Sequence, residues 1–241
     1  MDALRARMEP LCLLSSCPDR LLCLMESRAF AQWTLQDLQD TFRLKRHTTL
    51  PSLETWLAMP NEIDPAHRQT LERLQERVAR NSAYWSEEEL KFFLIAPLIN
   101  MADYHDPVHF FGGRLISAQV DDFYLSGVVD GMLADGEYAP RRPFFCLHEY
   151  KPEESGRKDD PAAQVLSAML VADRLNEDDE PVFGAYVLGR FWFFLVLEGR
   201  NYAISKDYST SHNDIFDVLR ILKNLDQLIR ERVERATLRR G

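Results

Sequence analysis

The chain has 241 residues, of which 46% are hydrophobic and 28% are charged, and its formal net charge is −9. This length allows one sizeable core with attached elements, or one full domain with a smaller second one. The negative charge argues mildly against a dedicated duplex-binding protein, which is usually basic, but it leaves room for an enzyme with a local basic strip.

The segment from residue 11 to 25 is apolar, but Asp19 and Arg20 interrupt it. No stretch of about 20 apolar residues occurs anywhere, so we expect a cytoplasmic protein with no membrane partner. The cysteines match no zinc-binding spacing and are too few for a disulfide scaffold. We expect buried, reduced thiols at all four positions: Cys12, Cys17, Cys23 and Cys146.

Residues 1 to about 85 are predicted to be helical. Thr34 is a candidate N-cap for one helix, and Pro65 opens a second with Leu71, Leu74 and Val78 on one face. Between them lies a basic cluster that would be either a solvated surface or a phosphate contact, formed by Arg43, Lys45, Arg46 and His47. Because this region carries no catalytic signature, we divide the chain into an N-terminal helical extension, 1–85, and a main domain, 86–241.

The main domain is predicted to open with a helix that Ser86 caps and that runs to about Met101. Glu87, Glu88 and Glu89 fall in its first turn, where the helix dipole favours negative charge. Pro97 lies inside the apolar part of this helix and predicts a kink or an early end.

Apolar runs then predict a series of strands at 114–120, 123–133, 144–150, 182–188 and 191–197, with a short extension at 202–205. Helices are predicted at 162–175 and at about 212–235. Gly189 and Arg190 are expected to form a hairpin turn. This order of elements predicts an α/β fold in which helices flank a mixed central sheet.

Two apolar patterns leave alternatives open. The last predicted helix carries a seam that would be either core or a homodimer contact: Ile215, Val218, Leu222, Leu225, Ile229 and Val233. The aromatic run Phe191, Trp192, Phe193 and Phe194 would be either a strand buried on both faces or a surface for base stacking.

Three charged side chains fall at strand positions where apolar neighbours make charge costly. Asp130 follows Val129 in an apolar strand, while Glu149 and Lys151 end the next strand. Residues two apart on a strand share a face, and hairpin pairing would bring Asp130 to that same face. His148 is expected on the opposite face.

Two carboxylates and an ammonium at one sheet end would suit a Mg²⁺ ion with an activated water. A lysine there would orient or deprotonate the water, or stabilise a phosphorane-like transition state. The spacing alone also fits a structural interpretation, in which Asp130 is a turn residue and Glu149 and Lys151 form an ordinary ion pair.

The wider pattern resembles the PD-(D/E)XK nuclease superfamily. Asp130 ends one strand, Glu149 and Lys151 end the next, and a helix follows with Gln164 thirteen residues after Lys151. Val129 stands where the superfamily motif has a proline. Residues 86–98, S-E-E-E-L-K-F-F-L-I-A-P-L, resemble the first helix of the nuclease domains in type I restriction subunits.

In that helix pattern a glutamate precedes the proline of an L-I-x-P motif by ten residues, which corresponds to Glu87, with Glu88 as the alternative. Lys91 falls where those domains often carry an arginine. The resemblance implies a set of roles: Glu87 as auxiliary acid, Asp130 and Glu149 as ligands of Mg²⁺ or Mn²⁺, Lys151 as catalytic lysine, and Gln164 as a supporting polar residue.

Residues 86 to about 229, about 60% of the chain, are also similar to a group of bacterial proteins with a restriction-endonuclease-like fold. The shared features are E-Y-K at 149–151, Q-V-L-S-A-M-L at 164–170 and G-R-F-W-F-F at 189–194. The resemblance implies Mg²⁺-dependent hydrolysis of nucleic acid, expected to be DNA, in a defence or mobile-element setting. The alternative is a non-catalytic module of the same fold that binds nucleic acid or a protein partner.

Overall fold

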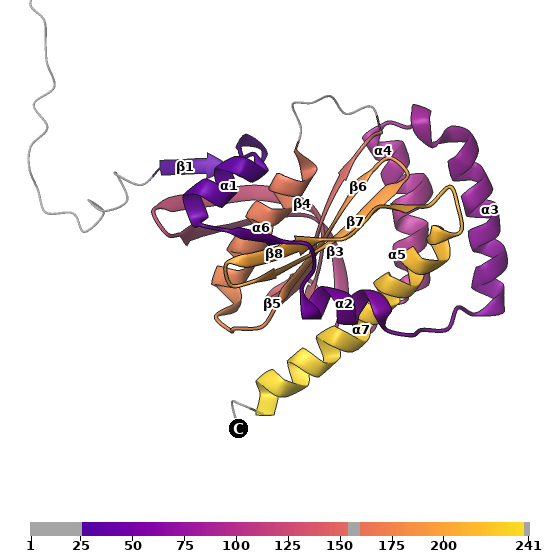
Figure 1. Cartoon of the computed structure of the whole chain (residues 1–241). Coiled ribbons are helices and arrows are strands. Elements are labelled where there is room, and N and C mark those ends of the chain that lie inside the picture. The colour runs from indigo at the N-terminus through magenta and orange to yellow at the C-terminus, as the bar shows by residue number, and fades with distance from the viewer. Residues whose placement is uncertain (1–25, 154–159, 239–241) are drawn as a thin grey trace, which may run out of the picture.

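A computed structural model describes residues 26–153 and 160–238 of the chain (Figure 1). The apolar segment at 11–25 and three of the cysteines, Cys12, Cys17 and Cys23, lie outside these residues. Within them, no helix is both long enough and apolar enough to span a membrane.

The helices are α1 (Leu35–Phe42), α2 (Pro51–Ala58), α3 (Pro65–Asn81), α4 (Glu87–Leu90), α5 (Ala96–Ala102), α6 (Pro161–Asn176) and α7 (Asp214–Leu238), with 3-10 turns η2 (Phe30–Gln32) and η3 (Ser82–Tyr84) and a π-helical turn η4 (Lys91–Ile95). The strands are β1 (Glu26–Ala29), β2 (Lys45–His47), β3 (His109–Val120), β4 (Phe123–Asp135), β5 (Arg141–Lys151), β6 (Val182–Leu188), β7 (Phe191–Glu198), β8 (Asn201–Ile204) and β9 (Tyr208–Ser209).

The strands form one mixed sheet in the order β1-β4-β5-β6-β7-β8-β2, with β3 paired to β4 and β9 paired to β7. β5 and β6 are parallel, whereas the β3–β4, β4–β5 and β6–β7 pairs are antiparallel. The predicted α/β class, a mixed sheet flanked by helices, is therefore confirmed. The predicted hairpin turn is also present, with Gly189 at a φ of 57°.

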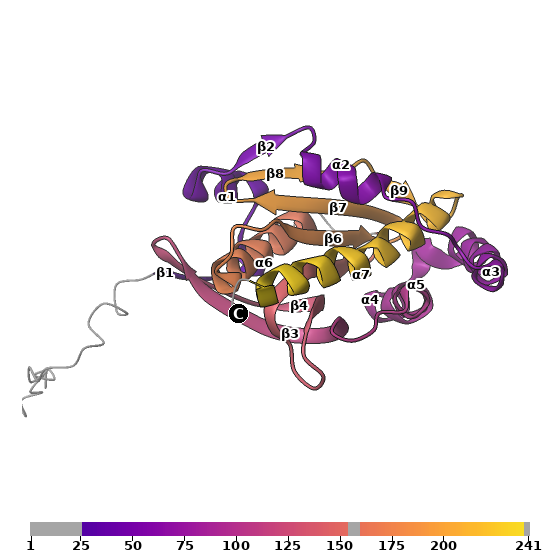
Figure 2. The same cartoon turned by 90° about the horizontal axis from the view of Figure 1, so that it is seen from below.

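The sheet separates two hydrophobic cores. One core lies under α2, α3, α5 and α7, and the other lies under η2, α1 and α6. Figures 1 and 2 show α7 running along the sheet as the long C-terminal helix. Its apolar seam belongs to the first core, and Ile215, Val218, Leu222, Leu225 and Ile229 are at most 1% exposed. The core interpretation of these residues is therefore confirmed.

The region before residue 85 contains strands as well as helices. α1 begins after Thr34, whose hydroxyl accepts the Asp37 N–H, and α3 begins at Pro65, as predicted. The two short strands were not predicted: β1 pairs with β4, and β2 pairs with β8, both in parallel. The division of the chain at residue 85 stays a prediction, although segments on its N-terminal side add strands to the same sheet.

The helix predicted after Ser86 is present but is interrupted by a π turn. Ser86 and Glu89 form a reciprocal capping box, and the Ala96 N–H bonds to the Lys91 carbonyl, five residues back. Because Pro97 has no N–H to donate, the regular hydrogen-bond ladder is already broken at this point. The predicted kink or early end is thus realised as a π turn, after which the helix continues as α5.

Candidate functional site

The neighbouring strands β4 and β5 bring the predicted acids and lysine together. Glu149 and Lys151 lie at the end of β5, as predicted, but Asp130 lies inside β4, which continues to Asp135 instead of ending at this residue. The paired ladder of the two strands starts at Gly131 opposite His148. Next to this end of the ladder, the Tyr150 N–H of β5 donates to a side chain of β4 and not to its backbone. The acceptor is Oδ2 of Asp130, at 2.8 Å. This bond fixes the Asp130 carboxylate beside the end of β5, where Lys151 Nζ lies 2.9 Å from Glu149 Oε1.

Helix α4 adds a carboxylate to this cluster, and the π turn η4 that follows it adds a second lysine. Lys91 Nζ lies 2.6 Å from Glu87 Oε1 and 2.9 Å from Asp130 Oδ1. The other Glu87 oxygen lies 3.7 Å from Lys151 Nζ. Glu87 therefore bridges the two lysines, whereas the Glu88 side chain is 86% exposed and reaches only Lys91, at 3.7 Å. We define the charged cluster as Glu87, Lys91, Asp130, Glu149 and Lys151.

The charged cluster holds three carboxylates and two ammonium groups, and Glu149 shows the effect of this imbalance. Burial, together with the nearby charges of Asp130 and Glu87, raises the pKa of Glu149 to about 7, although the contact with Lys151 acts to lower it. Burial opposes the charge of Lys91 and Lys151, but hydrogen bonds to carboxylates and the charges of the surrounding carboxylates together outweigh it and raise the pKa of both lysines. At neutral pH the two lysines are cations, and Glu149 is poised between its two forms.

The donor chemistry of the cluster fits Mg²⁺ or Mn²⁺. Asp130 and Glu149 offer hard oxygen ligands, and a cation between them would offset both the burial of the Glu149 charge and its repulsion by Asp130, which raise the Glu149 pKa. Among the described residues no group of three or more His, Cys, Asp or Glu side chains is arranged to hold a metal. Two protein carboxylates would leave the other coordination positions of Mg²⁺ to water and substrate phosphate, an arrangement that this ion commonly adopts.

Two other residues singled out in the sequence lie outside this cluster. Gln164 is 9% exposed in the first turns of α6, and no described interaction joins its side chain to the five residues of the cluster. His148 is 1% exposed, and its Nδ1 lies 2.7 Å from the Tyr150 hydroxyl. Burial lowers the pKa of His148 to about 3, so it is a neutral residue of the interior.

Lys91 is the member of the cluster that the sequence did not assign a role. It lies four residues after Glu87 on the same helix face, a spacing that brings opposite charges into contact. That spacing was a usable signal, but its contact with Asp130 depends on how α4 packs against the sheet. A comparison of the chain with known protein families and with curated proteins finds no match.

Proposed function

We propose that this protein is a Mg²⁺- or Mn²⁺-dependent nuclease that hydrolyses phosphodiester bonds, with DNA as its substrate. The observation that supports this most is the meeting of Asp130, Glu149 and Lys151, from two neighbouring strands, with Glu87 from a helix. A partly exposed cluster of acids and ammonium groups with a strongly raised carboxylate pKa is typical of a functional site.

Asp130 and Glu149 would hold the metal ion, which when bound activates water and neutralises phosphate charge. Lys151 acts as a cation, because its raised pKa keeps the proton that a general base would have to lose. Its ammonium group is positioned to donate hydrogen bonds to the attacking water or to the charge that develops on phosphorus oxygens. Glu87 positions Lys151 and Lys91 through its two carboxylate oxygens.

A second candidate is a non-catalytic module that binds nucleic acid or a protein partner. One observation favours it: both Asp130 oxygens already have partners, namely Lys91 and the Tyr150 N–H. The cluster therefore partly neutralises Asp130 without a metal. The net charge of −9 also suits a protein partner better than a tightly held duplex.

The two candidates are separated by metal binding and cleavage measured on the same variants. We expect cleavage of labelled single- or double-stranded DNA with Mg²⁺ or Mn²⁺, with RNA oligonucleotides tested alongside. Asp130→Asn should abolish cleavage and weaken Mg²⁺ binding, measured by calorimetry. Asp122→Asn, in the exposed turn between β3 and β4, is the matched control and should change neither. Mg²⁺ binding without cleavage of any substrate would favour the binding module.

A further inference from the structure

The aromatic run in β7 divides between the two faces of the sheet. Trp192 and Phe194 are fully buried in the core under α7, as a central strand predicts. Alternation places Phe191 and Phe193 on the opposite face, where both are partly exposed. The run is therefore fully buried on one face of the sheet and only partly buried on the other.

Phe193 forms a flat aromatic pair with Tyr186 of β6. Their ring centroids are 4.5 Å apart and their planes are inclined by only 12°. Most aromatic contacts of this protein are tilted or edge-on, for example Trp56 with Phe183 at 73°. Burial raises the pKa of Tyr186 to about 12, helped by the carboxylate of Asp160 and opposed by Arg46, so the ring stays neutral at physiological pH.

The strand register places this aromatic pair beside the charged cluster. Glu149 is opposite Tyr186 in the β5–β6 pair, and Tyr186 is opposite Phe193 in the β6–β7 pair. The next pairs along the same face are Lys151 with Leu188 and Leu188 with Phe191. Since neighbouring strands lie about 5 Å apart, Tyr186 and Phe193 lie about one and two strand spacings from Glu149.

Arg190 supplies a cation at the rim of this face. The Gly189 N–H bonds to the Lys151 carbonyl at 2.8 Å, so the hairpin turn is tied to the strand end that carries the cluster. The Arg190 guanidinium lies 5.0 Å from the Phe191 ring centre and 3.1 Å from a Glu153 oxygen. Asp160 also lies near Tyr186. Its carboxylate accepts hydrogen bonds from the Leu35 and Ala163 N–H groups.

We propose that Tyr186, Phe193 and Phe191 form a stacking platform for the unpaired bases of a single-stranded nucleic acid, with Arg190 binding a phosphate of the same strand. This inference rests on the proposed function and names its substrate class. Flat, partly exposed rings stack on bases of any sequence, but duplex bases are stacked on one another and are not available to them. Because the platform adjoins the charged cluster on the same face of the sheet, the backbone of the bound nucleic acid would pass from the platform to the metal ligands.

Binding without cleavage tests the platform separately from catalysis. The probe is a fluorescent deoxyoligonucleotide of about 12 nucleotides in EDTA, offered as a single strand, as a duplex, and as a single strand with abasic positions. We expect the wild-type protein to prefer the complete single strand. Phe193→Leu should weaken that binding by roughly 5- to 150-fold, the range for the loss of one stacked base.

Phe216→Leu is the matched control. Phe216 is also partly exposed and also has an arginine over its ring, Arg68 at 5.2 Å, but it lies on α7 against the other core. Its substitution should leave binding unchanged. For the wild-type protein, abasic positions in the probe should weaken binding about as much as Phe193→Leu weakens binding of the complete probe. The Phe193→Leu variant, which has already lost the stacking ring, should bind the abasic and the complete probe with nearly equal affinity.

Equal binding of single strand and duplex would overturn the platform, as would an undiminished affinity of folded Phe193→Leu or of the wild-type protein for the abasic strand. These outcomes leave the nuclease proposal to be judged by the cleavage assay with Asp130→Asn. Conversely, base-dependent binding of single strands without cleavage in Mg²⁺ or Mn²⁺ would support the platform and count against the nuclease.

Discussion

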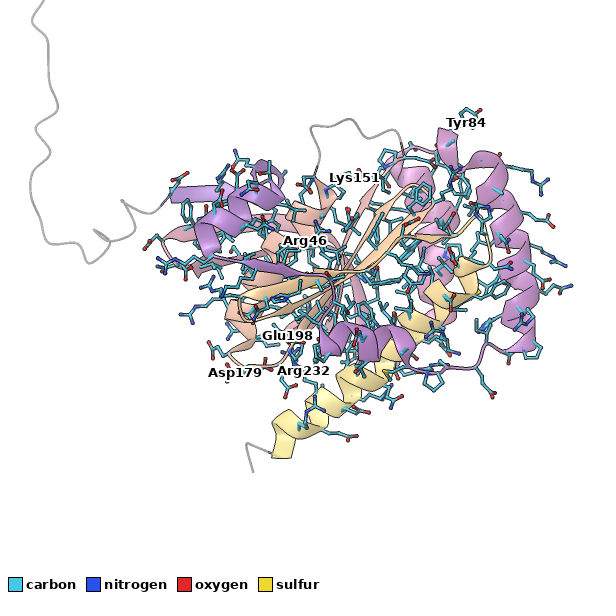
Figure 3. All side chains as sticks on the ribbon, in the orientation of Figure 1. Arg46, Tyr84, Lys151, Asp179, Glu198 and Arg232 are labelled. Atoms are coloured by element: carbon cyan, nitrogen blue, oxygen red, sulfur yellow. The ribbon has the colours of Figure 1, made fainter. Side chains whose placement is uncertain are left out.

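Two clusters of buried charge lie toward opposite ends of the sheet, around Lys151 and around Arg232 (Figure 3). Arg232 of α7 is 4% exposed, and its guanidinium bonds to both oxygens of Asp178 and to the Pro181 carbonyl, the latter at 2.9 Å. The Phe145 ring centre lies 5.4 Å from the guanidinium carbon. One cation thus meets one carboxylate, and its donors are used in bonds within the fold.

The charged cluster at the other end is not balanced in this way. Three carboxylates share two lysines there, and burial together with Asp130 raises the Glu149 pKa to about 7. A balanced pair such as Arg232 with Asp178 contributes to structure, because removing either partner would leave a buried charge alone. An unbalanced cluster gains from a further cation, which is why we assign function to this end of the sheet.

After the loss of cleavage expected for Asp130→Asn, the largest effect is on activity, from Lys151→Ala. If Lys151 stabilises transition-state charge, its removal should lower cleavage by about 10²- to 10³-fold, the usual loss for one electrostatic donor. Lys223→Ala is the control. Lys223 lies on α7, away from the charged cluster, and donates an exposed hydrogen bond to the Glu62 carbonyl. Single-turnover cleavage in Mg²⁺ measures both, and circular dichroism checks the fold. A Lys151→Ala variant as fast as the control would refute the mechanism.

The next effect is on stability, from Arg232→Met. It leaves Asp178 without its partner in a partly buried place, so we expect a loss of about 3 kcal/mol in the free energy of unfolding. Arg235→Met is the control, because Arg235 lies three residues further along α7 but is largely exposed, and its loss should cost under about 1 kcal/mol. Urea titration measures both values. Equal losses would show that burial does not distinguish the two ion pairs.

The sequence allowed most of the sheet and the meeting of Asp130, Glu149 and Lys151 in the candidate site to be predicted, because both follow from local patterns. β6 and β7 are continuous apolar runs, and the two-residue step from Glu149 to Lys151 places them on one face. The short strands β1 and β2 could not be predicted, since E-S-R-A and K-R-H are polar and become strands only by pairing with β4 and β8. The π turn and the contact of Lys91 with Asp130 likewise depend on tertiary packing.

A smaller effect concerns pH and Glu149. Its folded pKa of about 7 lies above the ordinary value of 4.5, so the protonated form is favoured by folding. The contribution of Glu149 to stability is therefore fully present below pH 4.5 and is lost as the pH rises through about 7. Relative to Glu149→Gln, the metal-free wild-type protein should lose about 2 kcal/mol between pH 5 and pH 8. Urea unfolding at both pH values checks this, and parallel profiles would contradict the assigned pKa.

The smallest expected effect compares two neighbouring glutamates at the start of α4. Glu87 contacts both lysines of the cluster, whereas the largely exposed Glu88 lies 3.7 Å from Lys91 alone. If Glu87 positions Lys151, then Glu87→Gln should slow cleavage by about 10-fold, because a less well placed Lys151 stabilises the transition state less; this corresponds to about 1.4 kcal/mol. Glu88→Gln should leave the rate unchanged. The effect should appear in kcat rather than in KM, because Glu87 acts through Lys151 and not on the substrate. Equal cleavage rates for the two variants would show that Glu87 does not contribute to catalysis, and the site would then consist of the residues of β4 and β5 alone.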